Sequence, residues 1–319
     1  MSAERGAGVL RSWLFVPGDS ERKQAKALGT GADALILDLE DSVDPAQLPA
    51  ARARVRELLR AQRPGSTPQL WVRVNPPRGS WREDLAALFA APAKPGSGAG
   101  RQGPDGIVVP KVATPAEIVA VADHLTALET ERGMSGGVTG LLVIATETPQ
   151  GMLSLPQYPA ALGAAPAVAA RLAGLTWGAE DLGAALGASA RRDSSGALTF
   201  TFALARTTCL LAAAALGVQA IDGVHVDFRD AAGLARALAE ARRDGFSGKL
   251  AIHPEQVPPI NAAFTPTEEE RRHAQRVIAA FAAAGGAGVA SLDGQMIDRP
   301  HLLQARRVLA AGARRSGNV

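Results

Sequence analysis

Short apolar runs alternate with alanine-rich segments of helical period along most of the chain. Each run is bounded by turn residues, which is typical of strands buried in a parallel sheet. The runs lie at residues 13–16, 34–37, 70–74, 106–109, 141–145, 172–177, 218–221 and 249–252. Segments of helical period follow most of them, at 19–28, 45–60, 81–89, 115–128, 156–173 with breaks, 201–216 and 231–243. Eight strands with intervening helices predict an α/β fold, the (β/α)8 TIM barrel.

The chain continues beyond the eighth predicted strand. Thr265 to Glu268 has the order of a capping box with a proline at the first helical position, so we expect a helix to about residue 284 that closes the barrel. Next come an apolar patch at 289–292, a turn at Asp293-Gly294 and an amphipathic helix at 300–311. We therefore expect a catalytic barrel domain at 1–284 and a C-terminal helical extension at 285–319 that acts as a lid or an oligomer arm.

Composition excludes several classes of protein. The 319 residues are 47% hydrophobic and 20% charged, which is typical of a globular chain with a large core. The net charge is only +3 and the basic pairs are diluted by other residues, so nucleic-acid binding is not expected. The N-terminus has no signal-peptide pattern and no apolar stretch is long enough to span a bilayer, so we expect a cytoplasmic protein. The single cysteine, Cys209, lies in an apolar run and is interpreted as a buried thiol.

Polar side chains lie at the carboxyl ends of five predicted strands, where the active site of a TIM barrel is found. These residues are Asp38, Glu40, Asp41, Arg73, Lys111, Glu147, Glu180 and Asp181. Glu147 and Asp181 come from neighbouring strand ends, so their oxygens can share one Mg²⁺ ion and leave positions open for water and substrate. The structural alternative is that each carboxylate caps a helix or pairs with a surface arginine.

Arg73 stands inside an apolar strand, where a guanidinium needs an anionic partner. That partner is either a carboxylate of the protein, Asp38 or Glu40, or a carboxylate or enolate of the substrate. Lys111 carries a competing hypothesis, because a desolvated lysine in a barrel can form a Schiff base with a keto substrate. A Schiff base would leave the predicted metal pair without a purpose.

Other motifs exclude further chemistry. Residues 98–103 match G-x-G-x-x-G, but no predicted strand precedes them and Pro104 follows, so a dinucleotide site is not expected. The five histidines have no zinc-ligand spacing, and neither a serine elbow nor a P-loop is present. His253, after the eighth predicted strand, is interpreted as a residue that holds its loop.

Together the motifs at the strand ends resemble those of the citrate lyase β-subunit family, within the HpcH/HpaI aldolase/citrate lyase superfamily, which includes malyl-CoA and citramalyl-CoA lyases. They occur in order as RSWLFVPG at 11–18, LDLEDSV at 37–43, VRVN at 72–75, VPKV at 109–112, ETP at 147–149, GAEDL at 178–182, IHP at 252–254 and MIDRP at 296–300. The resemblance runs from about residue 11 to 311.

The resemblance implies a Mg²⁺-dependent carbon–carbon lyase that cleaves a carboxylated 3-hydroxyacyl-CoA to an acyl-CoA and a 2-oxo acid. The resemblance also implies that Glu147 and Asp181 are the metal ligands and that Arg73 binds the substrate and its enolate. It implies that Asp298 is an acid that acts in the site of a neighbouring subunit. It therefore implies a homo-oligomer, with a trimer favoured. We also assign Arg11 and Lys111 to cofactor binding.

Alternatives stay open at this stage. A citrate lyase β subunit acts on a carrier-protein thioester, and a malyl-CoA-type thioesterase hydrolyses the thioester instead of cleaving the carbon chain. A class II aldolase would use the same metal and arginine but needs a basic histidine near the metal, for which the strand ends offer no evident candidate. A non-catalytic accessory barrel needs neither a metal pair nor an acid on the extension.

Overall fold

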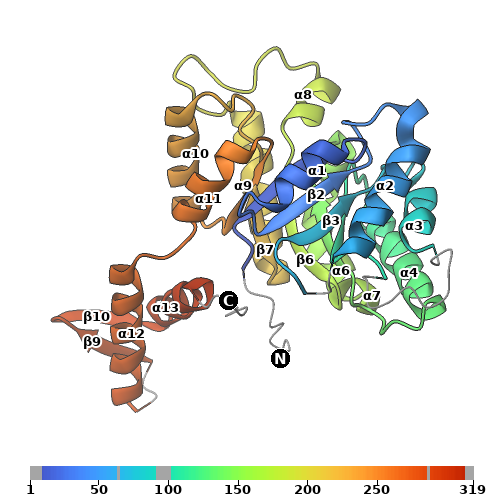
Figure 1. Cartoon of the computed structure of the whole chain (residues 1–319). Coiled ribbons are helices and arrows are strands. Elements are labelled where there is room, and N and C mark those ends of the chain that lie inside the picture. The colour runs from blue at the N-terminus through green and yellow to red at the C-terminus, as the bar shows by residue number, and fades with distance from the viewer. Residues whose placement is uncertain (1–8, 63–64, 91–101, 286–287, 313–319) are drawn as a thin grey trace.

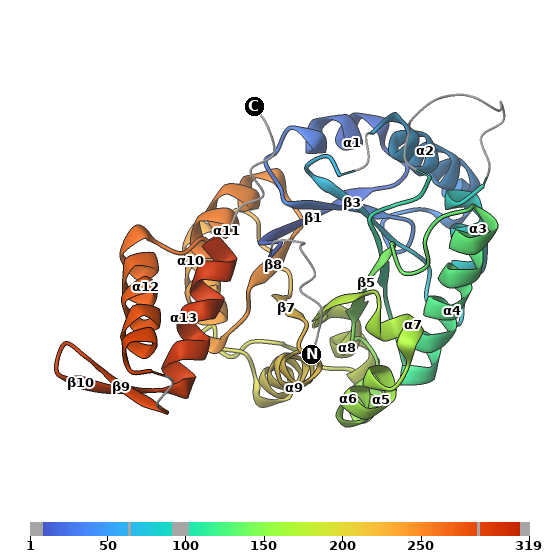
Figure 2. The same cartoon turned by 90° about the horizontal axis from the view of Figure 1, so that it is seen from below.

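The computed structural model of the chain, which describes residues 9–62, 65–90, 102–285 and 288–312, is a closed barrel with a separate C-terminal extension (Figures 1 and 2). The eight barrel strands pair in chain order, all parallel, and β1 also pairs with β8. They are β1 Ser12–Pro17, β2 Ala34–Asp38, β3 Gln69–Arg73, β4 Gly106–Val109, β5 Gly140–Ile144, β6 Leu172–Thr176, β7 Gln219–Asp222 and β8 Gly248–Ala251. The predicted TIM barrel is confirmed.

Helices surround the barrel on its outer face, as Figure 2 shows. They are α1 Glu21–Leu28, α2 Leu48–Ala61, α3 Trp81–Leu88, α4 Pro115–Glu131, α5 Pro149–Ser154, α6 Tyr158–Gly163, α7 Pro166–Ala169, α8 Glu180–Leu186, α9 Phe200–Leu216, α10 Ala231–Asp244 and α11 Val257–Ala263. The short 3₁₀ turns are η1 Pro45–Gln47, η2 Leu155–Gln157 and η3 Pro254–Gln256. The apolar faces of these helices and the outward side chains of the strands form the main core.

A second apolar cluster fills the barrel interior and closes it to solvent. Trp13 of β1 and Trp71 of β3 meet edge to face there, with ring centroids 4.8 Å apart. Gly106 of β4 makes room for Trp71, because a Cβ atom at this position would lie 2.2 Å from the Trp71 ring. The strands therefore enclose a packed core, and ligand binding is left to the loops at their carboxyl ends.

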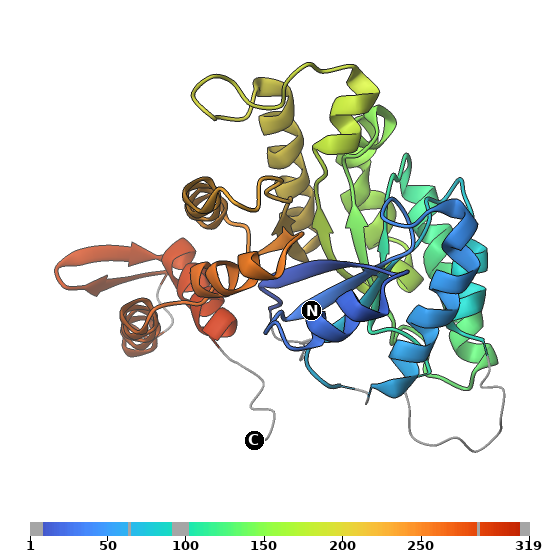
Figure 3. The ribbon, with the colours of Figure 1, turned by 45° about the horizontal axis from the view of Figure 1, so that its top comes forward.

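The C-terminal extension consists of α12 Glu268–Ala283, β9 Val289–Leu292, β10 Gln295–Asp298 and α13 Arg299–Gly312. It stands beside the barrel in Figures 1 and 3 and has its own apolar cluster, to which Val277, Phe281 and Ile297 contribute. The strands β9 and β10 form an antiparallel hairpin around the predicted turn at Asp293-Gly294.

The helix at 268–283 does not close the barrel as expected. It packs on α13 and β9, while the shorter α11 contacts β1 and β8 at the point where the barrel closes. The cap also differs from the expected one: Thr267 and Glu270 form the capping box, two residues later than Thr265 and Glu268. The side chain of Thr265 instead donates to the Asn261 carbonyl.

Two further predictions, on the glycine-rich stretch and on membrane-spanning segments, can be compared with the structure only within the described residues. Most of the glycine-rich stretch at 98–103 lies outside the described ranges. Within them, no helix has the length and apolar character that a membrane crossing requires.

Candidate active site

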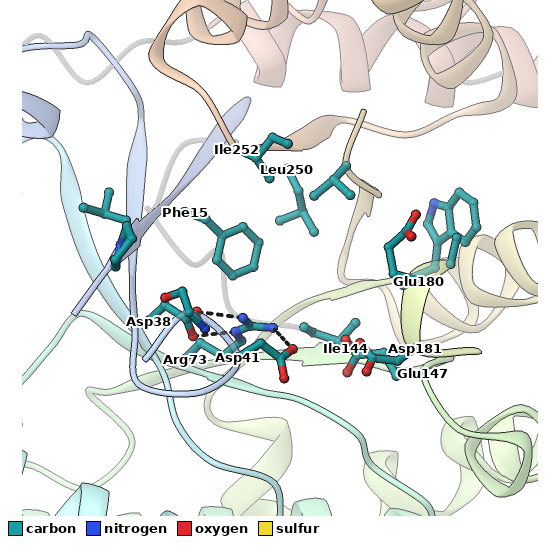
Figure 4. Close-up of a pocket in the computed structure, with 17 residues that line it drawn as sticks. Phe15, Asp38, Asp41, Arg73, Ile144, Glu147, Glu180, Asp181, Leu250 and Ile252 are labelled. Carbon is teal, nitrogen blue, oxygen red and sulfur yellow. Dashed lines mark hydrogen bonds and ion pairs between the residues drawn. The ribbon is translucent and has the colours of Figure 1, made fainter. Parts of the chain in front are cut away.

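A cavity of about 380 Å³ opens at the carboxyl ends of the barrel strands (Figure 4). Its lining includes six of the eight polar residues predicted at the strand ends: Asp38, Asp41, Arg73, Glu147, Glu180 and Asp181. Apolar side chains from β1 and β8, Phe15 and Leu250 among them, complete the wall. The site thus combines an apolar wall with a few charged groups, as small-molecule sites do.

Arg73 is held in the cavity by carboxylates at the end of β2 and in the loop after it. Its Nε and Nη2 donate to the two oxygens of Asp38, each at 2.7 Å, which is a bidentate pair. Its Nη1 lies 2.8 Å from Glu40 Oε2 and 3.3 Å from Asp41 Oδ2. Burial opposes the charge, but Asp38 and Glu40 outweigh it and raise the pKa of Arg73. The guanidinium also lies 4.8 Å from the ring centre of Phe15, so its position is fixed from several sides.

Arg73 therefore has anionic partners within the protein. Both predicted candidates, Asp38 and Glu40, contact its guanidinium. Pairing does not remove Arg73 from the cavity, since the residue lines it. Asp41 is half exposed and makes the longest of the contacts, at 3.3 Å. It is the partner that an incoming anion can most readily replace.

Glu147 and Asp181 both line the cavity, and the charge of Asp181 acts on Glu147 (Figure 4). Glu147 follows β5 and is buried, whereas Asp181 belongs to the first turn of α8 and is about one-third exposed. Burial, reinforced by the nearby charge of Glu40, raises the pKa of Glu147 to about 8, although Lys111 and Arg73 oppose the shift. A buried carboxylate beside other carboxylates is an environment that a cation stabilises.

The donor set can be compared with what divalent ions require. No group of three or more His, Cys, Asp or Glu side chains within the described ranges is arranged to hold a metal. Two carboxylate ligands fit Mg²⁺, which is commonly bound by one or two carboxylates together with water and substrate oxygens. They do not fit a structural zinc site, which needs four protein ligands.

Lys111, assigned to cofactor binding, lies next to Glu147 and Asp181, the predicted metal ligands. Its Nζ is 2.6 Å from Glu40, 2.7 Å from Asp41 and 3.3 Å from Asp181. Partial burial lowers the stability of the charged form, but Asp41 and Glu40 outweigh it and raise the pKa of Lys111. A lysine held in its charged form by carboxylates is a poor nucleophile, so the arrangement argues against the Schiff-base hypothesis.

Arg11 does not lie at the cavity. It precedes β1, at the opposite end of the barrel from the strand ends that carry the site. Its guanidinium pairs with Asp33 at 2.7 Å and donates to the hydroxyl of Thr265 at 2.7 Å. The assignment of Arg11 to cofactor binding is therefore wrong for this structure, because its donors tie the start of β1 to neighbouring segments.

Asp298 also lies away from the cavity of its own chain. It ends β10 in the extension, and its carboxylate is 2.6 Å from Nδ1 of His301. Asp298 is not among the residues that line the cavity. A role for Asp298 in catalysis therefore requires the site of a second copy.

The carboxylate that supports the cavity wall at Trp177 was not predicted from the sequence. The indole Nε1 of this residue donates to Asp222 at 2.8 Å, and Asp222 is buried between Lys249 and Arg206. Two signals were available: Asp222 directly follows the apolar run at 218–221, and Lys249 begins the eighth apolar run, where it needs a counter-charge as Arg73 does.

Comparison with known proteins identifies the family. Residues 11–254 match the model of the HpcH/HpaI aldolase/citrate lyase family. The chain belongs to this family. It is 37% identical over 307 residues to a (3S)-malyl-CoA thioesterase of Cereibacter sphaeroides (strain ATCC 17029 / ATH 2.4.9), covering 95% of each chain. It is 34% identical to the mitochondrial citramalyl-CoA lyase of Homo sapiens, covering 94% of this chain and 84% of the relative.

The fold is shared with solved family members. The protein CitE from Mycobacterium tuberculosis, in complex with magnesium, acetoacetate and coenzyme A, superposes with a TM-score of 0.72 at 33% identity. The similarity covers 96% of this chain and 99% of CitE, so it extends over the barrel and the extension of this family member.

Proposed function

We propose that the protein is a Mg²⁺-dependent carbon–carbon lyase that cleaves a carboxylated 3-hydroxyacyl-CoA, of the malyl-, citramalyl- or citryl-CoA type, to an acyl-CoA and a 2-oxo acid. The observation that carries the proposal is the presence of Arg73 and the pair Glu147 and Asp181 in one cavity at the carboxyl end of the barrel. Family membership and the named lyase relatives support it. Magnesium and coenzyme A in the CitE complex support the choice of metal and of acyl carrier.

In this proposal Glu147 and Asp181 hold the metal. Mg²⁺, when bound, supplies positive charge that polarises the substrate oxygen that becomes the carbonyl of the 2-oxo acid. The protein holds the substrate between this end of the cavity and Arg73, so both product fragments stay oriented while the bond breaks.

Arg73 stabilises the charge that cleavage creates. The electron pair of the broken carbon–carbon bond passes to the thioester fragment and forms an enolate. The hydroxyl group gives its proton to solvent at the partly exposed end of the cavity and becomes the new carbonyl, and one proton is later returned to the enolate carbon. A guanidinium already fixed by Asp38 and Phe15 needs little reorganisation to bind this oxyanion. The apolar wall keeps water from the charge and strengthens the interaction.

Asp298 completes the reaction by moving a proton at the enolate carbon, as general acid in cleavage and general base in condensation. Since Asp298 does not reach the cavity of its own chain, we propose that it acts in the site of a neighbouring subunit of a homo-oligomer, with a trimer favoured. The extension has its own apolar cluster beside the barrel, which supports its role as an arm that reaches a neighbouring subunit.

Thioester hydrolysis is the second candidate, because one relative at 37% identity is a malyl-CoA thioesterase. The same residues would serve it: a substrate held by Arg73 and the metal pair can be attacked by water at the thioester carbonyl. A carrier-protein thioester in place of the CoA ester is a variant of the first proposal, supported by the relative named citrate lyase subunit beta-like protein.

The test is an assay of the purified protein with and without Mg²⁺, with EDTA controls, on malyl-, β-methylmalyl-, citramalyl- and citryl-CoA. Free 2-oxo acid and free thiol are measured separately. Metal-dependent release of oxo acid without thiol is the result expected of the lyase. Thiol without oxo acid would identify a thioesterase instead, and absence of both products would reject the CoA esters as substrates.

A further inference from the structure

Lys111 contacts both residues of the metal pair through different parts of its structure. Its backbone N–H donates to Glu147 Oε2 at 2.6 Å. Its side-chain Nζ lies 3.3 Å from Asp181 Oδ1. One residue therefore connects the carboxylate that follows β5 with the carboxylate that opens α8.

The ammonium of Lys111 is also held from the side of β2. It donates to Glu40 Oε1 at 2.6 Å and to Asp41 Oδ1 at 2.7 Å. Three carboxylates, two from the loop after β2 and one from the first turn of α8, thus surround one cation, and Glu40 is almost fully buried. Without the cation these carboxylates would repel one another, and more strongly than in water because the site is partly desolvated.

The backbone of Lys111 is in an uncommon conformation. Its φ angle is +49°, in the left-handed region that is unfavourable for a residue with a Cβ atom. Such a conformation persists where surrounding contacts determine it, and these positions gather at functional sites. Here it turns the chain out of β4 so that N–H and ammonium reach different carboxylates.

We propose that Lys111 is a positioning residue that holds Glu147 and Asp181 at the separation that a divalent cation requires. The inference rests on the proposed function, since it takes these two residues as the Mg²⁺ ligands. It assigns to Lys111 a structural part in metal binding in place of contact with a cofactor. Partners of metal ligands commonly change metal affinity by about 10- to 100-fold when they are removed.

The test measures Mg²⁺ binding by calorimetry, with Mg²⁺ alone and no thioester present. Lys111→Asn removes the ammonium while asparagine tolerates the left-handed conformation, so the N–H bond to Glu147 is retained. We expect it to bind Mg²⁺ about 10-fold more weakly than the wild type. Lys111→Arg keeps the positive charge and should recover part of the affinity. The control is Arg78→Asn, which removes an exposed cation paired with Glu117 outside the cavity and should bind Mg²⁺ as the wild type does.

The opposite outcomes separate the two proposals. If the ammonium only competes with the metal for Asp181, Lys111→Asn will bind Mg²⁺ more tightly, and the positioning role is overturned. Unchanged affinity in a folded Lys111→Asn variant overturns it as well. A wild-type protein that binds no Mg²⁺ would overturn the assignment of the metal pair and with it the role of Lys111. The melting temperature of each variant, measured without metal, shows whether a loss of affinity accompanies unfolding.

Discussion

The ammonium of Lys249 on β8 lies 2.6 Å from Asp222 Oδ2 at the end of the neighbouring strand β7. Both residues are almost fully buried, and Arg206 of α9 contacts the same carboxylate at 3.0 Å. The pair stands behind Trp177, whose ring lines the cavity.

Replacing Asp222 with Asn should strongly destabilise the fold, because the substitution leaves Lys249 and Arg206 without their shared counter-charge. Removal of one partner of a buried pair costs about 3–5 kcal/mol. Chemical denaturation of Asp222→Asn measures this loss in the free energy of unfolding. The double variant Asp222→Asn with Lys249→Met removes both charges and should regain part of it. A single variant as stable as the wild type would contradict the assigned role.

The same carboxylate predicts acid sensitivity. Burial favours the neutral form of Asp222, but Lys249 and Arg206 outweigh it and lower its pKa below the ordinary value of 3.8. The folded state therefore gains stability from ionised Asp222 above that value and loses it as the pH falls through the lowered pKa. Unfolding measured between pH 5 and about pH 2 should show a smaller loss in Asp222→Asn than in the wild type. Equal losses would assign acid unfolding to other groups.

Arg73→Lys should reduce kcat by about 10²- to 10³-fold, as removal of an oxyanion donor does in other enzymes. Lysine keeps the charge beside Asp38 but loses the bidentate contact that fixes its direction. Mg²⁺ affinity, measured by calorimetry, should change little, because Arg73 is not a ligand of the metal in our proposal. A normal kcat in the variant would show that Arg73 forms structural ion pairs and has no part in catalysis.

Glu147→Gln should abolish Mg²⁺ binding and yet stabilise the metal-free protein at alkaline pH. Burial and the charge of Glu40 raise the pKa of Glu147 from its ordinary value of 4.5 to about 8, so the metal-free fold loses stability as the pH rises through this interval and loses no more from this group above it. Melting curves in EDTA at pH 6 and pH 9 measure the effect, and the wild type should lose more stability over this interval than the variant. Calorimetry with Mg²⁺ gives the accompanying loss of binding. Wild-type Mg²⁺ affinity in the variant would remove Glu147 from the metal site.

Asp298→Asn should abolish turnover and leave Mg²⁺ affinity intact, because the acid moves a proton and is not a ligand. A mixing experiment tests whether it acts in a second subunit. When the weakly active Arg73→Lys chain and the inactive Asp298→Asn chain are unfolded together and reassembled in equal amounts, about one quarter of the sites in a cyclic assembly receive both intact residues. Recovered activity supports action between subunits. Mixtures no more active than their components would place both residues in one chain or remove Asp298 from the reaction.

Sequence predicted the barrel strands closely because each is a buried apolar run that ends at turn residues. The prediction at 106–109 coincides with β4, and the one at 218–221 differs from β7 by one residue. The short helix α8 and the strand β10 were not expected. Only Leu182 and Gly183 are buried in α8, and only Ile297 is buried in β10, so neither has a clear apolar period.

The site was predictable in part for the same reason. Arg73, Glu147 and Asp181 follow from the strand ends, and the structure brings them to one cavity. The contacts of Lys111 depend on a left-handed backbone angle that no residue pattern indicates. The elements that pack on α12 could not be predicted either. An amphipathic pattern indicates that one face of a helix is buried, but it does not indicate which element covers that face.

Pairing of β1 with both β2 and β8 leaves the barrel without a free strand edge. Among the described strands, unpaired edges therefore remain only at the hairpin of β9 and β10. Free edges are the places where sheets of different molecules join and aggregate. These strands have four residues each, and Asp293 and Asp298 bring charge to them, which are features that limit such joining. Loops of the barrel can thus change in sequence without exposing a strand edge to which strands of other molecules could bind.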